Sequence, residues 1–211
     1  MGNAEALQAR LHELAERDWD LAAIAARFDK LCRQGIPRKP LSQLDPTRRQ
    51  ELLDRVQRRA EEYCYLMRNC ARGTATALFE EFGLGNIETI KALAAFPGIG
   101  MTGGTCGAVS GGLLALGLFF SNEDLTNYLD PSAHLAARNF TQRFQEAFGS
   151  VACADIQKLI FGKYYDPLSS LENLQAFNEA HAREQCPLAP GLGARIAAEI
   201  ILDTTPGQAT V

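Results

Sequence analysis

Residues 103–120 read GGTCGAVSGGLLALGLFF, a stretch without a charged side chain. Its apolar part, from Ala108 to Phe120, is shorter than the roughly 20 residues that a membrane span needs, so we predict a buried core helix. Small residues recur every four positions at its start: Gly103, Gly107 and Gly111 in one row, and Gly104, Ala108 and Gly112 in the next. Glycine costs up to ~1 kcal/mol per position in a helix interior, so this bare face is expected to admit a close neighbour. That neighbour could be a cofactor, another helix or a second copy of the chain.

The composition places the chain among ordinary globular proteins. It has 211 residues, of which 46% are hydrophobic and 22% charged. The formal net charge is -4, so bulk electrostatics favour neither nucleic acid nor an anionic membrane as a partner. The segment from Met1 to Ala15 carries charged side chains where a secretory signal needs an apolar run. We therefore expect a cytoplasmic protein without a membrane span, in a compartment where thiols stay reduced.

Helical periodicity runs through the rest of the chain, and no alternating strand pattern appears. We therefore predict an all-α fold: a compact helical bundle with the glycine-rich helix buried inside it. Capping residues, prolines and glycines mark the expected helices at 4–16, 20–35, 45–67, 70–82, 86–96, 108–120, 130–149, 152–161, 169–177 and 190–202. The spacing of Ser169 and Glu172 is typical of a capping box. Leu135 and the phenylalanines after it are expected to face inward. We divide the chain into an N-terminal helical extension (1–43), a helical redox domain (44–203) and a flexible tail (204–211).

Six cysteines in a reducing compartment indicate metal or redox chemistry more than structural disulfides. Four of them, Cys70, Cys106, Cys153 and Cys186, fall at or shortly before predicted helix starts. Free N–H groups and the helix dipole at such positions lower a thiol's pKa, and Cys106 is expected to be the strongest thiolate. Four thiolates also match the ligand number of an iron–sulfur cluster or a closed zinc site. Because no CxxC pair occurs and cysteine often serves as a small buried hydrophobe, the spacing alone does not decide the chemistry.

The remaining candidates are weaker. Cys32 and Cys64 lie on apolar helical stripes and are interpreted as core residues. His181, five residues before Cys186, is the one histidine with a route into a site, although a surface role is expected. The GxGxxG spacing at 98–103 follows no strand, so we predict no dinucleotide site there.

Four segments carry a resemblance to a known family. They are Asn69-Cys70-Ala71, CGAVSG at 106–111, FGSVAC at 148–153, and Cys186 before an Ala/Ile-rich helix. The chain resembles the C-GCAxxG-C-C family of redox-active proteins over roughly residues 55–202. The resemblance implies a helical fold and a redox or metal role. A similar domain occurs in split-Soret cytochromes, which are dimers with haem and an iron–sulfur centre. No CxxCH sequence is present here, so only the iron–sulfur part and a homodimer are implied.

Our leading hypothesis is a redox-active protein that uses Cys70, Cys106, Cys153 and Cys186 as metal ligands. They would hold an iron–sulfur cluster or another metal for electron transfer with a redox partner protein. Gly103, Gly104, Gly107 and Gly111 would let the cofactor approach the backbone. One alternative is a thiol–disulfide protein with a cycling cysteine pair. Another is a zinc-stapled helical module that binds a partner. The sequence leaves open whether the chain is an enzyme.

Overall fold

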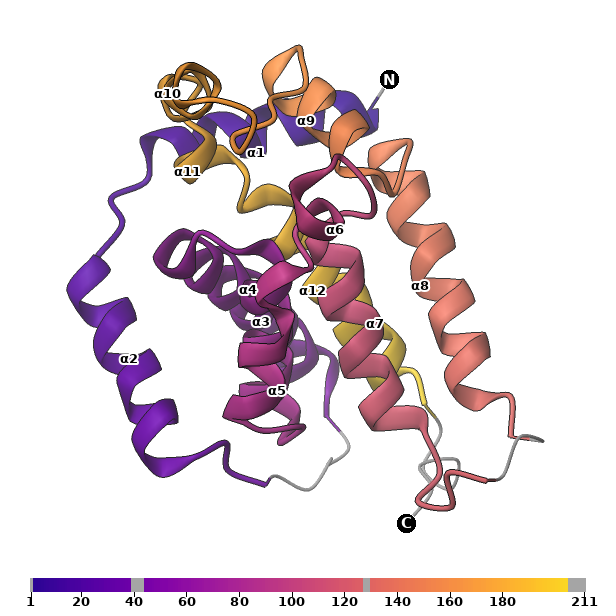
Figure 1. Ribbon diagram of the computed structural model, residues 1–211. Coiled ribbons are helices and arrows are strands. Elements are labelled where there is room, and N and C mark those ends of the chain that lie inside the picture. The colour runs from indigo at the N-terminus through magenta and orange to yellow at the C-terminus, as the bar shows by residue number, and fades with distance from the viewer. Residues whose placement is uncertain (1, 39–43, 127–129, 205–211) are drawn as a thin grey trace.

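The computed structural model describes residues 2–38, 44–126 and 130–204 (Figure 1). Within these ranges the regular structure is helical, apart from an isolated antiparallel bridge between Thr105 and Ala152, which confirms the predicted all-α class. The elements are α1 (Gly2–Glu16), α2 (Leu21–Gln34), α3 (Pro46–Met67), α4 (Cys70–Phe82), α5 (Ile87–Ala92), the 3₁₀ turn η1 (Leu93–Ala95), α6 (Gly98–Met101), α7 (Gly107–Phe120), α8 (Ser132–Phe148), α9 (Cys153–Phe161), α10 (Leu171–Glu179), α11 (Ala182–Gln185) and α12 (Leu188–Leu202). None of the helices in the described ranges has the length and apolar character required to cross a membrane.

Side-chain caps fix several helix starts at or near the positions that the sequence predicts. Asp20, Asp45, Asn69 and Asn86 each accept a hydrogen bond from the backbone N–H three residues later. The start of α10 differs by one residue, because Ser170 and not Ser169 accepts from the N–H of Asn173. The Ser169 hydroxyl instead donates to the Asp166 carbonyl oxygen in the preceding turn.

The central bundle consists of α3, α4, α7 and α12, with α8 packed along α7 and α12 (Figure 1). The neighbour of the glycine face on α7 is α4. A Cβ atom at Gly107 would overlap the Cys70 Sγ, and one at Gly111 would overlap the Ala71 carbonyl oxygen. In the second row, Gly112 lies against the Phe140 ring of α8. The small residues therefore let two helices approach α7 closely, which places the start of α4 against the start of α7.

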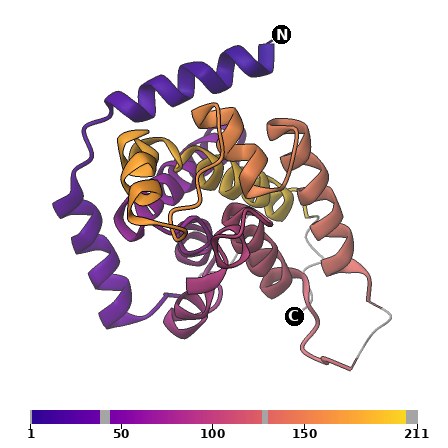
Figure 2. The same cartoon turned by 45° about the horizontal axis from the view of Figure 1, so that its top comes forward.

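The N-terminal helices α1 and α2 run around one side of the bundle (Figure 2). α2 packs on α3, whereas α1 packs on α11 and α12. Glu61 of α3, which is fully buried, accepts hydrogen bonds from Arg10 at 2.7 Å and from Arg17 at 2.8 Å. The Trp19 ring also stacks on Tyr65, with 4.3 Å between ring centroids. A buried carboxylate and an aromatic stack thus attach the N-terminal extension to the bundle. The predicted boundary between the extension and the rest of the chain, at residue 43, stays a prediction.

Two predicted core positions are wrong. Cys32 is exposed, because α2 buries only Ile24 and Leu31 and the next residue points about 100° away from that line. Leu135 is 60% exposed, since the buried line of α8 runs through Ala136, Phe140, Phe144 and Phe148. Residues 39–43, at the end of the predicted extension, and the predicted tail from 205 onward lie outside the described residues.

Candidate functional site

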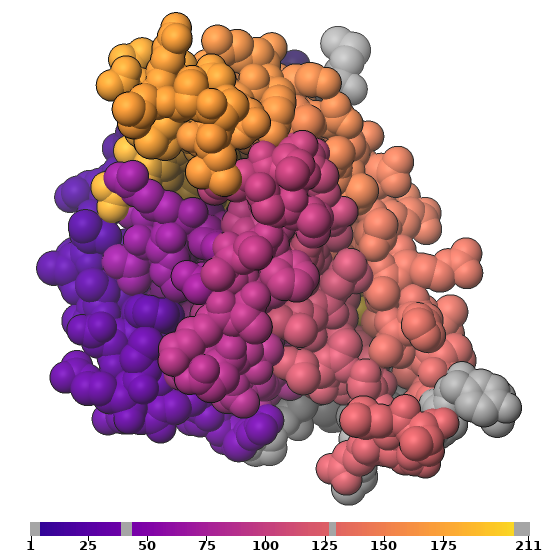
Figure 3. All heavy atoms as spheres, viewed as in Figure 1, coloured from indigo at the N-terminus to yellow at the C-terminus, as the bar shows by residue number. Residues whose placement is uncertain are grey.

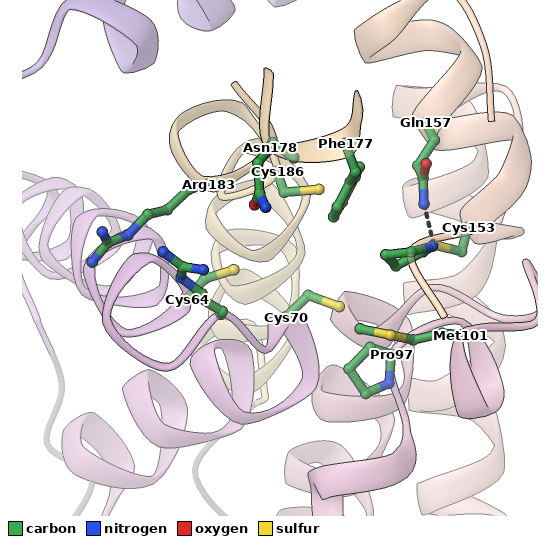
Figure 4. Close-up of a pocket in the computed structure, with 13 residues that line it drawn as sticks. Cys64, Cys70, Pro97, Met101, Cys153, Gln157, Phe177, Asn178, Arg183 and Cys186 are labelled. Atoms are coloured by element: carbon green, nitrogen blue, oxygen red, sulfur yellow. Dashed lines mark hydrogen bonds between the residues drawn. The ribbon is translucent and has the colours of Figure 1, made fainter. Parts of the chain in front are cut away.

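A pocket of about 110 Å³ opens between the end of the bundle and the helices above it, α9 to α11. In the space-filling view, the orange segment that contains these helices sits above the purple and magenta bundle helices (Figure 3). Four cysteines line the pocket: Cys64, Cys70, Cys153 and Cys186. In Figure 4 the sulfurs of Cys64, Cys70 and Cys186 reach toward a shared space, and Cys153 stands on the far side beside Gln157.

Cys70 is the first residue of α4, immediately after the Asn69 cap. The pKa of its thiol is lowered from the ordinary value, chiefly because the Cys106 thiol donates a hydrogen bond to the Cys70 sulfur. The backbone N–H groups of Gly107, Ala71 and Cys70 itself add to this effect and together outweigh burial. The sulfur of Cys70 therefore lies at the N-terminal ends of two helices, α4 and α7, where a thiolate is stabilised.

Cys106 caps the start of α7 and is buried, with 4% of its surface exposed. It lies against Cys70 and is absent from the lining of the pocket. Its hydrogen bond to Cys70 and its burial raise the pKa of the Cys106 thiol well above the ordinary value. The expectation that Cys106 is the strongest thiolate is therefore wrong. Of the two thiols, Cys70 therefore loses its proton more readily, and Cys106 is the hydrogen-bond donor.

Cys153 begins α9, yet its thiol gains nothing from the helix start. The Cys153 N–H donates to the Gly104 carbonyl oxygen at 2.7 Å, and the Ala154 N–H donates to Gly103 at 3.1 Å. Because these N–H groups are used, burial dominates and raises the pKa of Cys153 to about 11. The Gln157 amide lies 3.6 Å from the Cys153 sulfur and opposes this shift.

The same backbone bonds explain what Gly103 and Gly104 do here. Residues 103–106 run antiparallel to 151–154, and the Cys106 N–H donates to the Val151 carbonyl oxygen at 2.8 Å. The two segments hold Cys106 and Cys153 on adjacent pieces of chain. Gly103, Gly104, Gly107 and Gly111 contact protein atoms and are absent from the pocket lining. Their predicted contact with a cofactor stays a prediction.

Cys186 and Cys64 complete the lining. Cys186 lies between α11 and α12, at the C-terminal end of α11 and not at a helix start. Burial is the main reason that the pKa values of both thiols lie well above the ordinary value. The idea that four helix starts lower four thiol pKa values is therefore wrong for Cys106, Cys153 and Cys186. Among the cysteines of the described residues, only Cys70 has a lowered pKa.

The place of Cys64 in the pocket was not predicted, although its burial was. Cys64 occupies the last turn of α3, and only Arg68 and Asn69 separate α3 from α4. Arg68 adopts a left-handed backbone, with φ of 49°, which ends α3 sharply. Cys64 and Cys70 therefore face the same space across a two-residue corner. The Arg-Asn pair between two helical patterns is the sequence signal that could have indicated this.

An unusual loop forms the floor of the pocket. Gly98, Ile99, Gly100 and Met101 have φ values of 54°, 48°, 70° and 62°, in the left-handed region that a β-branched residue such as Ile99 rarely adopts. The Tyr164 hydroxyl donates to the Met101 carbonyl oxygen at 2.9 Å. This loop places Pro97 and Met101 under the thiols (Figure 4). Strained backbone of this kind persists where the surrounding structure holds it in place.

The arrangement does not provide a ready-made metal site. Among the described residues, no three His, Cys, Asp or Glu side chains come close enough together to hold a metal ion. The His181 side chain is 74% exposed and lies 4.0 Å from Glu184, so it does not join the cysteines. What the pocket does present is one thiol with a lowered pKa, Cys70, and three further thiols with raised pKa values, while Cys106 lies against Cys70 outside the lining.

The comparisons with known proteins give one match. The sequence model of a family described as "Putative redox-active protein (C_GCAxxG_C_C)" matches residues 68–200, which include Cys70, Cys106, Cys153 and Cys186 and exclude Cys64. Neither a curated protein nor a solved structure matches the chain.

Proposed function

The chain belongs to the C_GCAxxG_C_C family, described as redox-active, and from this membership we propose that it carries out thiol–disulfide exchange with Cys70 and Cys106 as the reacting pair. The observation that carries the proposal is the place of the Cys70 sulfur, which faces the pocket and lies against the start of α7 next to Cys106, where a Cβ atom at Gly107 would overlap it. The interaction with Cys106 also lowers the pKa of Cys70. A thiolate is the nucleophile in disulfide exchange, and a second thiol beside it can release the product.

The exchange proceeds in two displacements. The Cys70 thiolate attacks one sulfur of a substrate disulfide R–S–S–R′, so that a Cys70–S–S–R bond forms and R′–S⁻ leaves. With the charge on Cys70 gone, the Cys106 proton is no longer held by that sulfur and passes to the departing R′–S⁻. The Cys106 sulfur then attacks the Cys70 Sγ, forming the Cys70–Cys106 disulfide and releasing R–S⁻. Two electrons pass from the cysteine pair to the substrate disulfide.

Two substitutions of Cys106 test this proposal, both in a Cys32→Ser background because Cys32 is exposed and would react with any disulfide. Cys106→Ser keeps a hydroxyl donor near Cys70 but cannot form the second disulfide. We expect fast attack on a small disulfide and an accumulated Cys70 mixed disulfide, detected by mass spectrometry of the intact protein. Cys106→Ala removes the donor as well, so attack at neutral pH should also be slower. If Cys106→Ser still forms an internal disulfide at Cys70 at the original rate, another cysteine completes the exchange and the proposed pair is wrong.

An iron–sulfur cluster, or another metal ion such as zinc, is the second candidate. It is favoured by the four cysteines that line one pocket, which is the ligand number such sites use. In the described conformation these side chains do not form a ligand set, so binding would require the segments with Cys153 and Cys186 to approach Cys70. Iron, sulfide and zinc analysis after anaerobic purification tests this candidate. A brown protein whose iron content is lost in Cys186→Ser would establish the cluster and displace the dithiol proposal.

A redox partner protein, a homodimer and a cytoplasmic location also belong to the proposal. They rest on the resemblance and on the thiol chemistry, which needs a reducing pool to return Cys70 and Cys106 to thiols. Measuring the mass of the protein in solution, with and without a reductant, tests the homodimer.

A further inference from the structure

The charges around the pocket have one sign. Among the described residues that line it, Arg68 and Arg183 are the charged ones, and none is a carboxylate. The chain as a whole carries a net charge of -4, so this local excess of positive charge opposes the overall balance. A cleft with charge of one sign raises the local concentration of small ions of the opposite sign.

Each arginine is available to a ligand. Arg68 is exposed at the end of α3, and its guanidinium makes no hydrogen bond or ion pair with the described residues. Arg183 of α11 is held in place: its guanidinium lies 4.2 Å from the Tyr65 ring centroid, and its Nε donates to the Tyr65 carbonyl oxygen at 3.4 Å. No carboxylate among the described residues pairs with Arg183, so its charge is positioned but not neutralised. Figure 4 shows this guanidinium beyond Cys64, on the side of the pocket away from Cys153.

The interior of the pocket is small and largely apolar. Pro97, Met101 and Phe177 contribute apolar surface near the thiols, and Asn178 and Gln157 contribute amides. Its volume of about 110 Å³ is of the order of an engineered protein cavity that binds benzene. The sulfur of a substrate disulfide and a few heavy atoms bonded to it fit such a space, whereas the rest of each substituent must extend to the rim. The dimensions therefore favour a small molecule over a folded protein as the source of the disulfide.

We propose that the pocket selects low-molecular-weight disulfides whose substituents carry carboxylate or other acidic groups. This inference rests on the proposed thiol–disulfide function. The substrate sulfur would enter the apolar interior and reach Cys70, while an acidic substituent would lie at the rim beside Arg68 and Arg183. The exchange follows the two displacements given above, with R and R′ each bearing an acidic group. Two acidic thiols leave, and the Cys70–Cys106 disulfide remains.

Three small disulfides of different charge test this inference in the Cys32→Ser protein. Dithiobis(nitrobenzoate) carries a carboxylate on each ring, dithiodipyridine is neutral at neutral pH, and cystamine is cationic. The rate of Cys70 oxidation with each probe is measured in the parent protein and in Arg68→Gln and Arg183→Gln. We expect each substitution to slow the reaction with the anionic probe about three- to tenfold at low ionic strength, and to leave the neutral probe within about twofold. Added salt should remove most of the difference.

Matched variants separate charge from structure. Arg183→Lys keeps the charge and should restore much of the anionic rate, even though the stacking on Tyr65 changes. Arg138 is an exposed arginine of α8 outside the pocket lining, so Arg138→Gln should leave all three rates unchanged. Three outcomes would overturn one or both proposals. If Arg68→Gln and Arg183→Gln slow the reaction with all three probes equally, or if the charge of the probe does not affect its rate with the parent protein, the selectivity proposal is wrong and the exchange function stands. If an acidic protein disulfide reacts faster than every small probe and shows the same dependence on the arginines, a protein partner replaces the small molecule. If Cys70 reacts with no disulfide, both proposals fail.

Discussion

A helix start lowers the pKa of a thiol only where its N–H groups are free to point at the sulfur. Cys70 and Cys153 are both the first residues of helices. At Cys70 the N–H groups of two helices and the Cys106 thiol meet the sulfur, and the pKa is lowered. At Cys153 the N–H groups bind the carbonyl oxygens of Gly103 and Gly104, and burial raises the pKa to about 11. The comparison shows that hydrogen-bond partners decide the effect, and position in the helix alone does not.

This contrast predicts different pH profiles for two thiols in one pocket. Alkylation of Cys70 by iodoacetamide should reach half its maximal rate below pH 9.0, the ordinary value for a thiol. Alkylation of Cys153 should reach that point near pH 11. Mass spectrometry of peptides after timed alkylation measures both thiols in one sample. Equal midpoints for the two cysteines would show that the N–H groups at Cys70 do not stabilise its thiolate.

The same shift links Cys70 to stability with a definite sign. Because its pKa is lower in the folded protein than in the unfolded chain, the contribution of Cys70 to the free energy of unfolding is fully present above the unfolded pKa. It is lost as the pH falls through the folded pKa. Denaturation of the parent protein and of Cys70→Ser should therefore differ in pH dependence below pH 9.0, with the parent losing more stability on acidification. Parallel profiles would contradict the lowered pKa.

The sequence could predict three of the four cysteines that line the pocket, but not how the pKa values of the thiols differ. Cys70, Cys153 and Cys186 line one pocket, and Cys106 lies directly behind Cys70. The place of Cys64 in the pocket was not predicted, because a cysteine on an apolar helical stripe looks like an ordinary core residue. Only the corner after α3 turns Cys64 toward the pocket. The place of Arg68 and Arg183 beside the thiols was not predicted either, because it depends on how α11 packs near the end of α3. The Arg-Asn corner after α3 is a local signal for the place of Cys64, whereas local sequence patterns contain no information about the contact between Arg183 of α11 and Tyr65 of α3.

At the scale of elements, the contact between α4 and α7 depends on small residues, which predicts opposite results for two glycines of one helix. A Cβ atom at Gly107 would lie 2.8 Å from the Ala71 backbone nitrogen, whereas one at Gly117 would meet no atom within 4 Å. Gly107→Ala should therefore reduce the free energy of unfolding by about 1–3 kcal/mol through overpacking. Gly117→Ala should raise it by about 0.5–1 kcal/mol, because alanine favours the helix. Chemical denaturation of the two variants gives both values, and a neutral Gly107→Ala would mean that α4 and α7 are further apart than described.

Helix limits were predictable where a local signal specifies them. The caps at Asp20, Asp45, Asn69 and Asn86 use a side chain and a backbone N–H three residues apart, and both are read directly from the sequence. The four-residue helix α11 was not predicted, because a helix of that length depends on tertiary contacts and not on intrinsic propensity. The inward orientation of Leu135 failed for a related reason, since a second apolar residue beside the buried line of α8 has no neighbour to pack against.

At the scale of the whole molecule, Glu61 connects the N-terminal extension to the bundle. This carboxylate is fully buried, while the side chains of Arg10 and Arg17 are 31% and 14% exposed. Glu61→Gln should reduce the free energy of unfolding by about 2–3 kcal/mol, at the low end of the cost of breaking a buried ion pair, because both arginines reach solvent. Hydrogen exchange should become faster in α1 and α11, which pack on each other.

The matched control is Glu88→Gln, which removes an exposed ion pair with Lys91 and should change stability by less than about 1 kcal/mol. If Glu61→Gln has an effect as small as Glu88→Gln, the arginines do not fasten the extension, and the Trp19–Tyr65 stack must do so.

The pocket is also a seam between two layers of the molecule, with Cys64, Cys70 and Cys106 below it on α3, α4 and α7, and Cys153 above it on α9. Oxidation can therefore have two mechanical outcomes. A bond from Cys70 to Cys106 joins two helices that already touch and adds no covalent link to the upper layer. A bond from Cys70 to Cys153 would instead link α4 covalently to α9 and so hold the two layers together across the pocket. The choice of partner sulfur thus decides whether oxidation crosslinks the two layers or leaves them joined by non-covalent contacts alone.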